Sequence, residues 1–228
     1  FSVNIVVGGL LLAVWGRLNA MTYPLRLSRS LAKTATITLS IAVVLGVAPL
    51  LFVQVIYDPF WYSANLLSAW WAMLFLLLTT LGFLAAYVLY LWHEKRPTLS
   101  RNLGIFSILA VLCAGGIMHM LNMESLMPQL WGAWFSGGES LATSGWAFQS
   151  SSPVRLAHFL FPALINIGVF VMLYSWYQSK KAGHDEGYLC WVASLGRRLI
   201  RVGLAIQAFF GLWWLWLLPP DLKFITNP

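Results

Sequence analysis

Charged side chains are scarce in this sequence, and their scarcity excludes most water-soluble folds. Only 9% of the 228 residues are charged, whereas 60% are hydrophobic, and the mean hydropathy is +0.76. An ordinary soluble domain carries charge on about 25% of its residues. A soluble fold of this length could not bury so much apolar surface, so we expect the lipid bilayer to be part of the solvent.

Cysteines and the common catalytic motifs are also scarce. Cys113 and Cys190 are the only cysteines, and they form neither a CxxC nor a CxxCH pattern. This argues against a cysteine-based metal site and against covalently bound c-type haem in this chain. The sequence contains no Walker A, HExxH or nucleophile-elbow pattern, and no apolar run carries a row of carboxylates or arginines. None of the enzyme classes that use those motifs is indicated.

Six long apolar runs stand out instead. They cover about 3–15, 35–56, 66–92, 103–121, 154–177 and 199–218. Each of the last five reaches the roughly 20 residues that cross a bilayer as a helix, and we read the shorter first run as part of another such helix. The runs lack the alternation of a membrane β-barrel. The sequence therefore predicts an all-α, polytopic bundle of about six transmembrane helices, with residues 1–228 as one domain.

Lysine and arginine alternate between the loops. The first, third and fifth loops hold 12 of the 14, namely Arg17, Arg26, Arg29, Lys33, Lys95, Arg96, Arg101, Lys180, Lys181, Arg197, Arg198 and Arg201. The positive-inside rule places these loops in the cytoplasm, and both ends of the chain on the periplasmic side. The net charge of +7 and the pI near 9.7 follow from these loops. Because no contiguous basic face results, we do not expect a nucleic acid as partner.

The largest outer loop covers 122–153 and is rich in glycine and tryptophan. Within it, Gln129–Phe135 follows Pro128 and is predicted to form a short interfacial helix, so this loop is expected to lie on the membrane surface or against a partner. Aromatic residues elsewhere on the outer side are interpreted as interfacial anchors, namely Tyr57, Phe60, Trp61, Tyr62, Trp213, Trp214 and Trp216.

Two of the four histidines lie within apolar runs. His93 and His184 fall in basic loops, where contact with solvent or lipid head groups is the expected role. His119 ends the fourth run and His158 begins the fifth, so the topology places both at similar depth on the outer side. Ionisable groups inside a bilayer are costly and usually functional. Two imidazoles from neighbouring helices are suitable axial ligands for the iron of haem b.

Other interpretations of these histidines stay open. Either imidazole could simply form a hydrogen bond to a neighbouring helix. If His158 binds haem without His119, a methionine could supply the second ligand, and Met118, Met120 and Met123 are the candidates. Of these, Met123 is included with the two histidines among the predicted cofactor-binding residues.

Proline and small residues predict local features of the helices. Pro162 conflicts with the carbonyl of His158, so the fifth helix should be interrupted there, and Pro49 should act similarly in the second. The polar residues within the runs, Gln54, Asn166 and Gln207, are expected to form hydrogen bonds between helices. Small-residue pairs should allow close helix packing, and beside His119 one pair would also leave room for a flat macrocycle. These pairs are Gly82–Ala86 and Gly115–Gly116.

Two stretches of the sequence resemble a family of bacterial inner-membrane proteins. Residues 45–57, LGVAPLLFVQVIY, are similar to a GVAPLLFxQVLY signature, and residues 122–159, from Asn122-Met123 through Met127-Pro128 to the run PVRLAHF, are similar to a second one. These proteins are distantly similar to subunit I of cytochrome bd quinol oxidases and often accompany multihaem c-type cytochromes. The resemblance implies a haem- or quinol-associated role and transfers most directly to His158, whereas His119 does not match the family pattern.

These observations favour a membrane subunit of an electron-transfer complex. We expect it to bind haem b, to interact with quinone or quinol, or to do both, near the periplasmic side of the bacterial inner membrane. It would pass electrons to a periplasmic c-type cytochrome in company with other membrane subunits, as part of a quinol:cytochrome c oxidoreductase type of complex. Two alternatives remain, a haem-free scaffold that anchors a redox partner and a transporter of small solutes.

Overall fold

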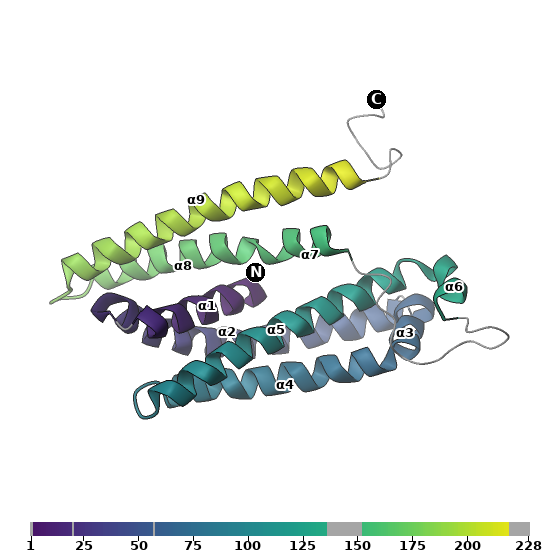
Figure 1. Cartoon of the computed structure of the whole chain (residues 1–228), viewed down its shortest axis with the longest axis horizontal. Helices are drawn as coiled ribbons and strands as arrows, with labels where there is room; N and C mark the ends of the chain where they lie inside the picture. Colours follow the sequence, from purple (N-terminus) through teal and green to yellow (C-terminus); the bar gives the residue numbers. More distant parts are fainter. Residues whose placement is uncertain (1, 20, 57, 136–151, 219–228) are drawn as a thin grey trace. The chain divides into compact units, whose positions relative to one another are not determined.

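The structure is a computed structural model that describes residues 2–19, 21–56, 58–135 and 152–218. In these ranges the chain is helical and contains no strand, which confirms the predicted all-α class (Figure 1). The helices are α1 (Ser2–Asn19), α2 (Thr22–Ile56), α3 (Asp58–Leu67), α4 (Ala69–Leu91), α5 (Pro97–Ser125), the 3-10 helix η1 (Pro128–Leu130), α6 (Trp131–Phe135), α7 (Pro153–Leu160), α8 (Pro162–Ser179) and α9 (Glu186–Leu217).

Five helical stretches are long and apolar enough to cross a membrane. They cover Thr22–Val53, Ala69–Leu91, Pro97–Ser125, Pro153–Ser179 and Glu186–Leu217, and the shorter apolar helix Val3–Asn19 precedes them. Each of the six predicted runs therefore coincides with one helical stretch. The helices extend beyond the apolar runs, because α2 and α9 start 13 residues before the predicted 35 and 199, within basic segments. Hydropathy locates the membrane-crossing part of a helix, but not the polar turns that continue it.

The described helices fall into two compact units. The N-terminal unit contains Ser2 and Gly9–Ser152, and the C-terminal unit contains Val3–Gly8 and the described residues from Pro153 onwards. In the N-terminal unit α4 and α5 pack as an antiparallel pair beside α2 and α3. In the C-terminal unit α8 and α9 lie side by side (Figure 1). The turn between α8 and α9 contains Gly183, whose φ of 70° favours glycine.

Small residues define where the helices of each unit come closest. A Cβ at Gly82 of α4 would lie 3.2 Å from the Cβ of Ala110 of α5, which confirms the predicted close approach at this position. The hydroxyl of Ser107 adds a hydrogen bond of 2.8 Å to the carbonyl of Gly82. In the C-terminal unit, a Cβ at Gly196 of α9 would lie 2.8 Å from the carbonyl oxygen of Gly168 of α8. The backbones themselves are in contact there, as in many membrane helix pairs.

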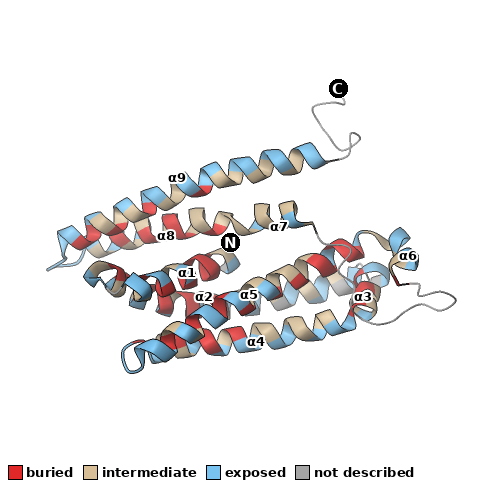
Figure 2. Ribbon diagram, in the orientation of Figure 1, coloured by how far each residue is buried: buried red, intermediate tan, exposed pale blue. Residues whose placement is uncertain are grey.

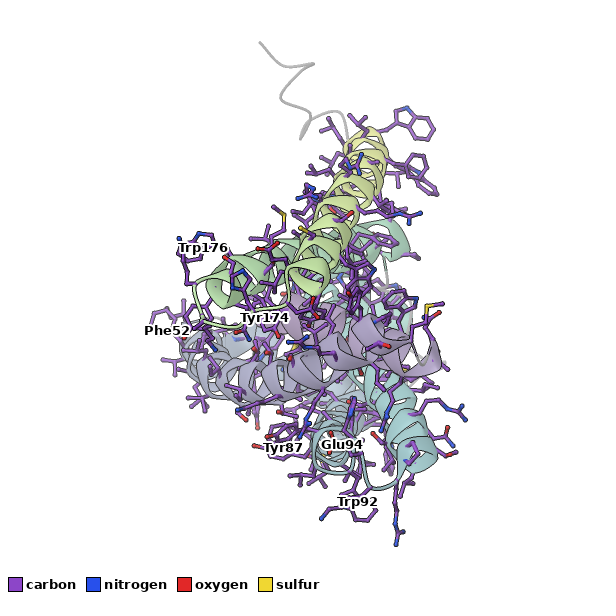
Figure 3. The ribbon with its side chains drawn as sticks, turned by 90° about the vertical axis from the view of Figure 1, so that its left-hand side faces the viewer. Phe52, Tyr87, Trp92, Glu94, Tyr174 and Trp176 are labelled. Atoms are coloured by element: carbon purple, nitrogen blue, oxygen red, sulfur yellow. The ribbon has the colours of Figure 1, made fainter. Side chains whose placement is uncertain are left out.

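Large apolar side chains cover much of the outside of both units. Exposed residues extend along most of α9 and along one side of α4 (Figure 2). Phe52 and Trp176, labelled in Figure 3, are 66% and 62% exposed. A surface of this kind is stable only in contact with lipid or with another protein. The structure and the composition together therefore indicate a multi-pass membrane protein in contact with the bilayer.

Several local predictions are confirmed and two need correction. The chain between Pro128 and Phe135 is helical as predicted, in η1 and α6. The fifth predicted helix is interrupted at Phe161, so that α7 ends one residue before it and α8 begins at Pro162. In contrast, α2 continues through Pro49 without a break. Trp61 is wrongly interpreted as an interfacial anchor, because it is only 6% exposed and packs against Ile117, Met120 and Leu121.

Candidate functional site

His158 lies near the end of α7 and contacts α9 within the C-terminal unit. Its ring nitrogens Nδ1 and Nε2 lie 3.0 Å and 3.3 Å from the side-chain amide nitrogen Nε2 of Gln207 on α9. The interhelical hydrogen bond predicted for Gln207 is thus confirmed. The break at Pro162 separates α7 from α8, and Phe161 still donates its N–H to the carbonyl of Ala157 at 3.0 Å. The sequence thus positions the imidazole on a short helix that ends just beyond it.

The amide of Gln207 can hold the imidazole in either of two ways. Its oxygen and nitrogen are nearly indistinguishable in shape, so the partner of the ring is set by the tautomer of His158. When the amide oxygen accepts a hydrogen bond from one ring N–H, the lone pair of the other ring nitrogen is left for a metal. This arrangement is common among metal-binding histidines, whose second nitrogen usually donates to a carbonyl or carboxylate. As placed, the amide nitrogen Nε2 faces both ring nitrogens and Oε1 has no hydrogen-bond partner among the described residues, so this arrangement requires the amide to be turned over.

Aromatic and basic side chains complete the surroundings of His158. The indole of Trp214 lies against the imidazole, with ring centroids 5.2 Å apart. Arg155, one turn earlier on α7, places its guanidinium 5.7 Å from the centroid of Trp214. At Gly211 of α9, a Cβ would approach Cε1 of His158 to 3.1 Å, so a larger residue would crowd the ring. We call these five residues, His158, Gln207, Gly211, Trp214 and Arg155, the His158 cluster.

The other predicted ligands, His119 and Met123, lie on α5 in the N-terminal unit. His119 is half-buried and Met123 is 8% exposed. Because His119 and His158 belong to different compact units, their pairing stays a prediction. The space beside Gly115 is open, since a Cβ there would meet nothing within 4 Å. Close helix packing is therefore not the reason for this glycine, and its predicted role beside His119 stays a prediction.

A second polar cluster lies around His93, and here the sequence-based interpretation was wrong. His93 was expected to contact solvent or lipid head groups, yet it is 4% exposed. Its Nε2 lies 3.0 Å from the hydroxyl oxygen of Ser28, which itself donates to the carbonyl of Ala13 at 2.5 Å. Because the single hydroxyl proton is used in that bond, Nε2 of His93 must be the donor to Ser28. The turn between α4 and α5 is thereby joined to both α1 and α2.

Charged groups surround this second cluster. Arg29 forms an ion pair of 2.6 Å with Glu94, and both side chains are exposed. Burial is the main cause that lowers the pKa of His93 from 6.5 to about 4, and Arg17 and Arg29 lower it further against the opposing effect of Glu94. The imidazole is therefore neutral near pH 7, in agreement with its role as a donor through one ring nitrogen. His184, the other loop histidine, contacts the carbonyl of Lys181 at 3.0 Å and is exposed as expected.

Glu124 is a buried acid that the sequence-based interpretation placed in the outer loop. The structure places it in the last turn of α5, fully buried, where Oε2 accepts a hydrogen bond of 2.7 Å from Ser68. Ser68 stands at the start of α4 but does not cap that helix. The indole N–H of Trp131 donates to the backbone carbonyl of Glu124 at 2.9 Å. The residue thus joins the α3–α4 junction, α5 and α6, and only its position just beyond an apolar run could have suggested burial.

Comparison with models of protein families, with curated proteins and with solved structures found no match. The family resemblance of residues 45–57 and 122–159 therefore stays an expectation. Within the described ranges, histidine, cysteine and acidic side chains do not gather in groups of three or more that could hold a metal ion. The two cysteines, both described, carry free and exposed thiols.

Proposed function

We propose that this chain is the membrane subunit of an electron-transfer complex and that His158 is an axial ligand of haem b. The observation that carries the proposal is the contact between His158 of α7 and Gln207 of α9. A hydrogen bond between helices would by itself explain the pair. An imidazole beside an amide that can orient it, packed against Gly211, supports the choice of an iron ligand.

The donor set of the His158 cluster fits the chemistry of a haem. A neutral imidazole supplies the bond to iron, and the Trp214 indole offers an apolar face against which a macrocycle can pack. The guanidinium of Arg155 suits the carboxylate of a propionate, because arginine binds carboxylates through two parallel hydrogen bonds. Bound there, haem b would supply one-electron transfer, and the residues of the cluster would hold it and set its surroundings.

The second ligand, the electron donor and acceptor, and the location in the cell are proposed from the sequence. We propose His119 or Met123 as the second axial ligand, quinol as the electron donor and a periplasmic c-type cytochrome as the acceptor. The bacterial inner membrane is the proposed location, with both ends of the chain on the periplasmic side. The arrangement of basic loops supports this orientation, because 12 of the 14 basic residues occupy alternate loops.

A haem assay on the purified full-length protein tests the proposal. Pyridine haemochrome analysis and reduced-minus-oxidised spectra should detect b-type haem in the wild type. His158→Ala should lose this haem, and the exposed-loop variant His184→Ala should retain it as the matched control. Gln207→Leu should keep the haem but shift its potential, because the orienting hydrogen bond is lost.

The second ligand is tested separately with His119→Ala and Met123→Leu. Loss of an axial ligand should convert the six-coordinate spectrum of the haem to a high-spin one, in one variant and not in the other. If the purified protein contains no b-type haem in contact with this chain, the proposal fails. A scaffold role would then be favoured, because α9 exposes Phe209, Trp213 and Trp216, at 59%, 41% and 74%, to whatever partner or lipid covers them.

A further inference from the structure

Two basic loops of the N-terminal unit meet at one end of its helices. The end of α1 and the start of α2 carry Arg17, Arg26 and Arg29, and the turn between α4 and α5 carries Lys95 and Arg96. The bonds from His93 to Ser28 and from Arg29 to Glu94 hold these segments together. Figure 3 labels Glu94 and Trp92 in the turn between α4 and α5. The sequence showed two separate basic loops, and the structure makes them one surface.

Arg17 is the basic residue of this surface that lies deepest. It belongs to the last turn of α1 and is half-buried, whereas Arg26 and Arg29 are exposed. Its Nε and Nη2 are buried, and in the described parts of the chain neither has a hydrogen-bond partner. Two buried nitrogen atoms of a guanidinium that lack hydrogen bonds carry a desolvation cost. An anion bound at this position would remove that cost.

The nearest acid does not neutralise Arg17. Glu94 acts on it only through space, because the carboxylate of Glu94 forms its ion pair with Arg29. The neighbouring imidazole, His93, is neutral near pH 7 and adds no negative charge. The N-terminus of α5, which starts at Pro97 without a side-chain cap, adds partial positive charge. The local charge balance therefore favours an anionic ligand.

We propose that Arg17, at the junction of the two basic loops, binds the phosphate group of an anionic phospholipid. Arginine forms paired hydrogen bonds with phosphate oxygens, which suits the edge formed by Nε and Nη2 of Arg17. The same segment of the chain carries exposed apolar side chains, with Trp15 39% and Leu18 58% exposed on α1 and Met21 68% exposed just after it. In a bilayer such residues pack against acyl chains, so this segment offers a phosphate ligand next in sequence to apolar side chains that face lipid. A lipid satisfies both, whereas an acidic peptide would leave these exposed apolar side chains uncovered.

The proposal does not depend on haem or on electron transfer. It needs only that the protein is embedded in a bilayer, as its apolar surface indicates. Basic pockets between transmembrane helices bind lipid head groups in other proteins, where each basic residue contributes to the attraction of the anionic surface. In this chain the interior guanidinium, rather than the exposed arginines around it, is the predicted determinant.

Lipid binding by the purified full-length protein tests the site. Native mass spectrometry should count lipids retained from mixed micelles that contain phosphatidylglycerol or phosphatidylcholine, and thermal unfolding should be measured with the same lipids. The wild type should retain phosphatidylglycerol in preference to phosphatidylcholine and should unfold at a higher temperature with it. Arg17→Gln should weaken phosphatidylglycerol binding about tenfold or more, as expected for the loss of charge-assisted hydrogen bonds. The exposed Arg198→Gln, on α9, is the matched control and should bind as the wild type does.

Three results would overturn the proposal. Equal binding by the wild type and Arg17→Gln would remove Arg17 from any lipid site. Equal stabilisation by inorganic phosphate would show that a free anion, not a lipid, is the ligand. If Arg17→Gln does not fold, Arg17→Lys replaces it, because this variant keeps the charge and loses the fork. Arg17→Lys should then bind phosphatidylglycerol more weakly than the wild type, and unchanged binding would overturn the proposal.

Discussion

His93 illustrates how one side chain connects three helices of the N-terminal unit. Its imidazole donates to Ser28, and the hydroxyl of Ser28 continues the contact to the carbonyl of Ala13. Both side chains are buried, with exposures of 4% and 0%. In such a site an imidazole is stable in its neutral form, since protonation would add an uncompensated charge beside Arg17. The state of this residue should therefore affect stability at low pH.

We predict that the protein loses stability as the pH falls from about 6.5 towards about 4, and that His93 contributes to the loss. The pKa of His93 is about 4 in the folded protein, below the 6.5 of the unfolded chain. Between these values the unfolded chain binds more protons than the folded one, so unfolding becomes easier as the pH falls. The contribution should reach about 1–3 kcal/mol near pH 4. Unfolding in detergent at stepped pH would measure it.

His93→Gln is the informative variant for this prediction. Glutamine can still donate a hydrogen bond to Ser28, but it does not titrate, so the slope of stability against pH should become shallower. His184→Gln is the control, because that imidazole lies in an exposed loop and should leave the slope unchanged. An identical slope for the wild type and His93→Gln would contradict the assignment.

Sequence reasoning predicted one contact between polar side chains of different helices but missed two others. It predicted that Gln207 bonds another helix, and the bond to His158 confirms this. It could not predict that His93 would be buried, because its partner Ser28 lies 65 residues earlier and loop position specifies only a side of the membrane. The burial of Glu124 was not predicted for a similar reason, since its partners Ser68 and Trp131 belong to other elements.

Glycine contacts decide how closely the helices of the C-terminal unit pack. Gly168 and Gly196 face each other, and a Cβ at either one would lie within 3 Å of the carbonyl oxygen of the other. A Cβ at Gly8 of α1 would similarly lie 2.7 Å from Ile167 of α8. The helix backbones cannot yield at such contacts without moving apart. Packing of this kind is typical where lipid provides no hydrophobic drive for association.

Gly196→Ala should destabilise the protein by about 1–3 kcal/mol, because the added methyl group forces α8 and α9 apart. Gly115→Ala is the matched control. It also adds one methyl group to a glycine of an apolar helix, but a Cβ there meets nothing within 4 Å. The control should be neutral or stabilising by about 0.5–1 kcal/mol, as alanine favours helices. Chemical unfolding of both variants in the same micelles would measure the difference, and equal destabilisation would contradict the packing argument.

The break between α7 and α8 sets the position of His158 at the end of a short helix. We predict that Pro162→Ala permits a continuous helix through Phe161 and displaces His158 from Gln207, since proline removes both an N–H and room for the preceding turn. If His158 binds haem, the spectrum or potential of the haem should change. Pro49→Ala is the control, because α2 already continues through Pro49. Unchanged haem properties in Pro162→Ala would show that the break does not position the ligand.

Element boundaries were predicted less well than the positions of the apolar helices. All six apolar runs correspond to helical stretches, because about 20 apolar residues can cross a bilayer only as a helix or within a barrel. The basic extensions of α2 and α9 could not be recognised, since hydropathy falls where a helix leaves the membrane. The break at Pro162 was predictable because its cause is local, whereas the break at Ser68 was not.

At the scale of the whole molecule, alternating charge predicts which loops face which side. Ser28 and His93, from the first and third loops, are in contact, as required if these loops lie on the same side of the membrane. This contact concerns the N-terminal unit alone. The predicted side of the fifth loop, which joins α8 and α9, rests on its basic residues.

We predict that Lys95 and Lys181 lie in the cytoplasm and Gln129 in the periplasm. Single cysteines at these three positions can be tested in a background without Cys113 and Cys190, whose thiols are exposed and would otherwise react. A membrane-impermeant maleimide should label Gln129→Cys in cells with a permeabilised outer membrane. It should label Lys95→Cys and Lys181→Cys only after the inner membrane is disrupted. Labelling of either lysine position from outside would show that the predicted topology is wrong.

The contact of Ser28 with Ala13 and His93 also has a consequence for biosynthesis. Ala13 and Ser28 are only 15 residues apart, so this contact can form as soon as α1 and the start of α2 have left the ribosome. Gly16 assists it, because the backbone of Pro24 comes so close that no side chain would fit between them. His93 is synthesised 65 residues after Ser28 and completes the cluster only when α4 has been inserted. The contact between α1 and α2 can thus form early in synthesis, and His93 adds its hydrogen bond only after α4 has been made.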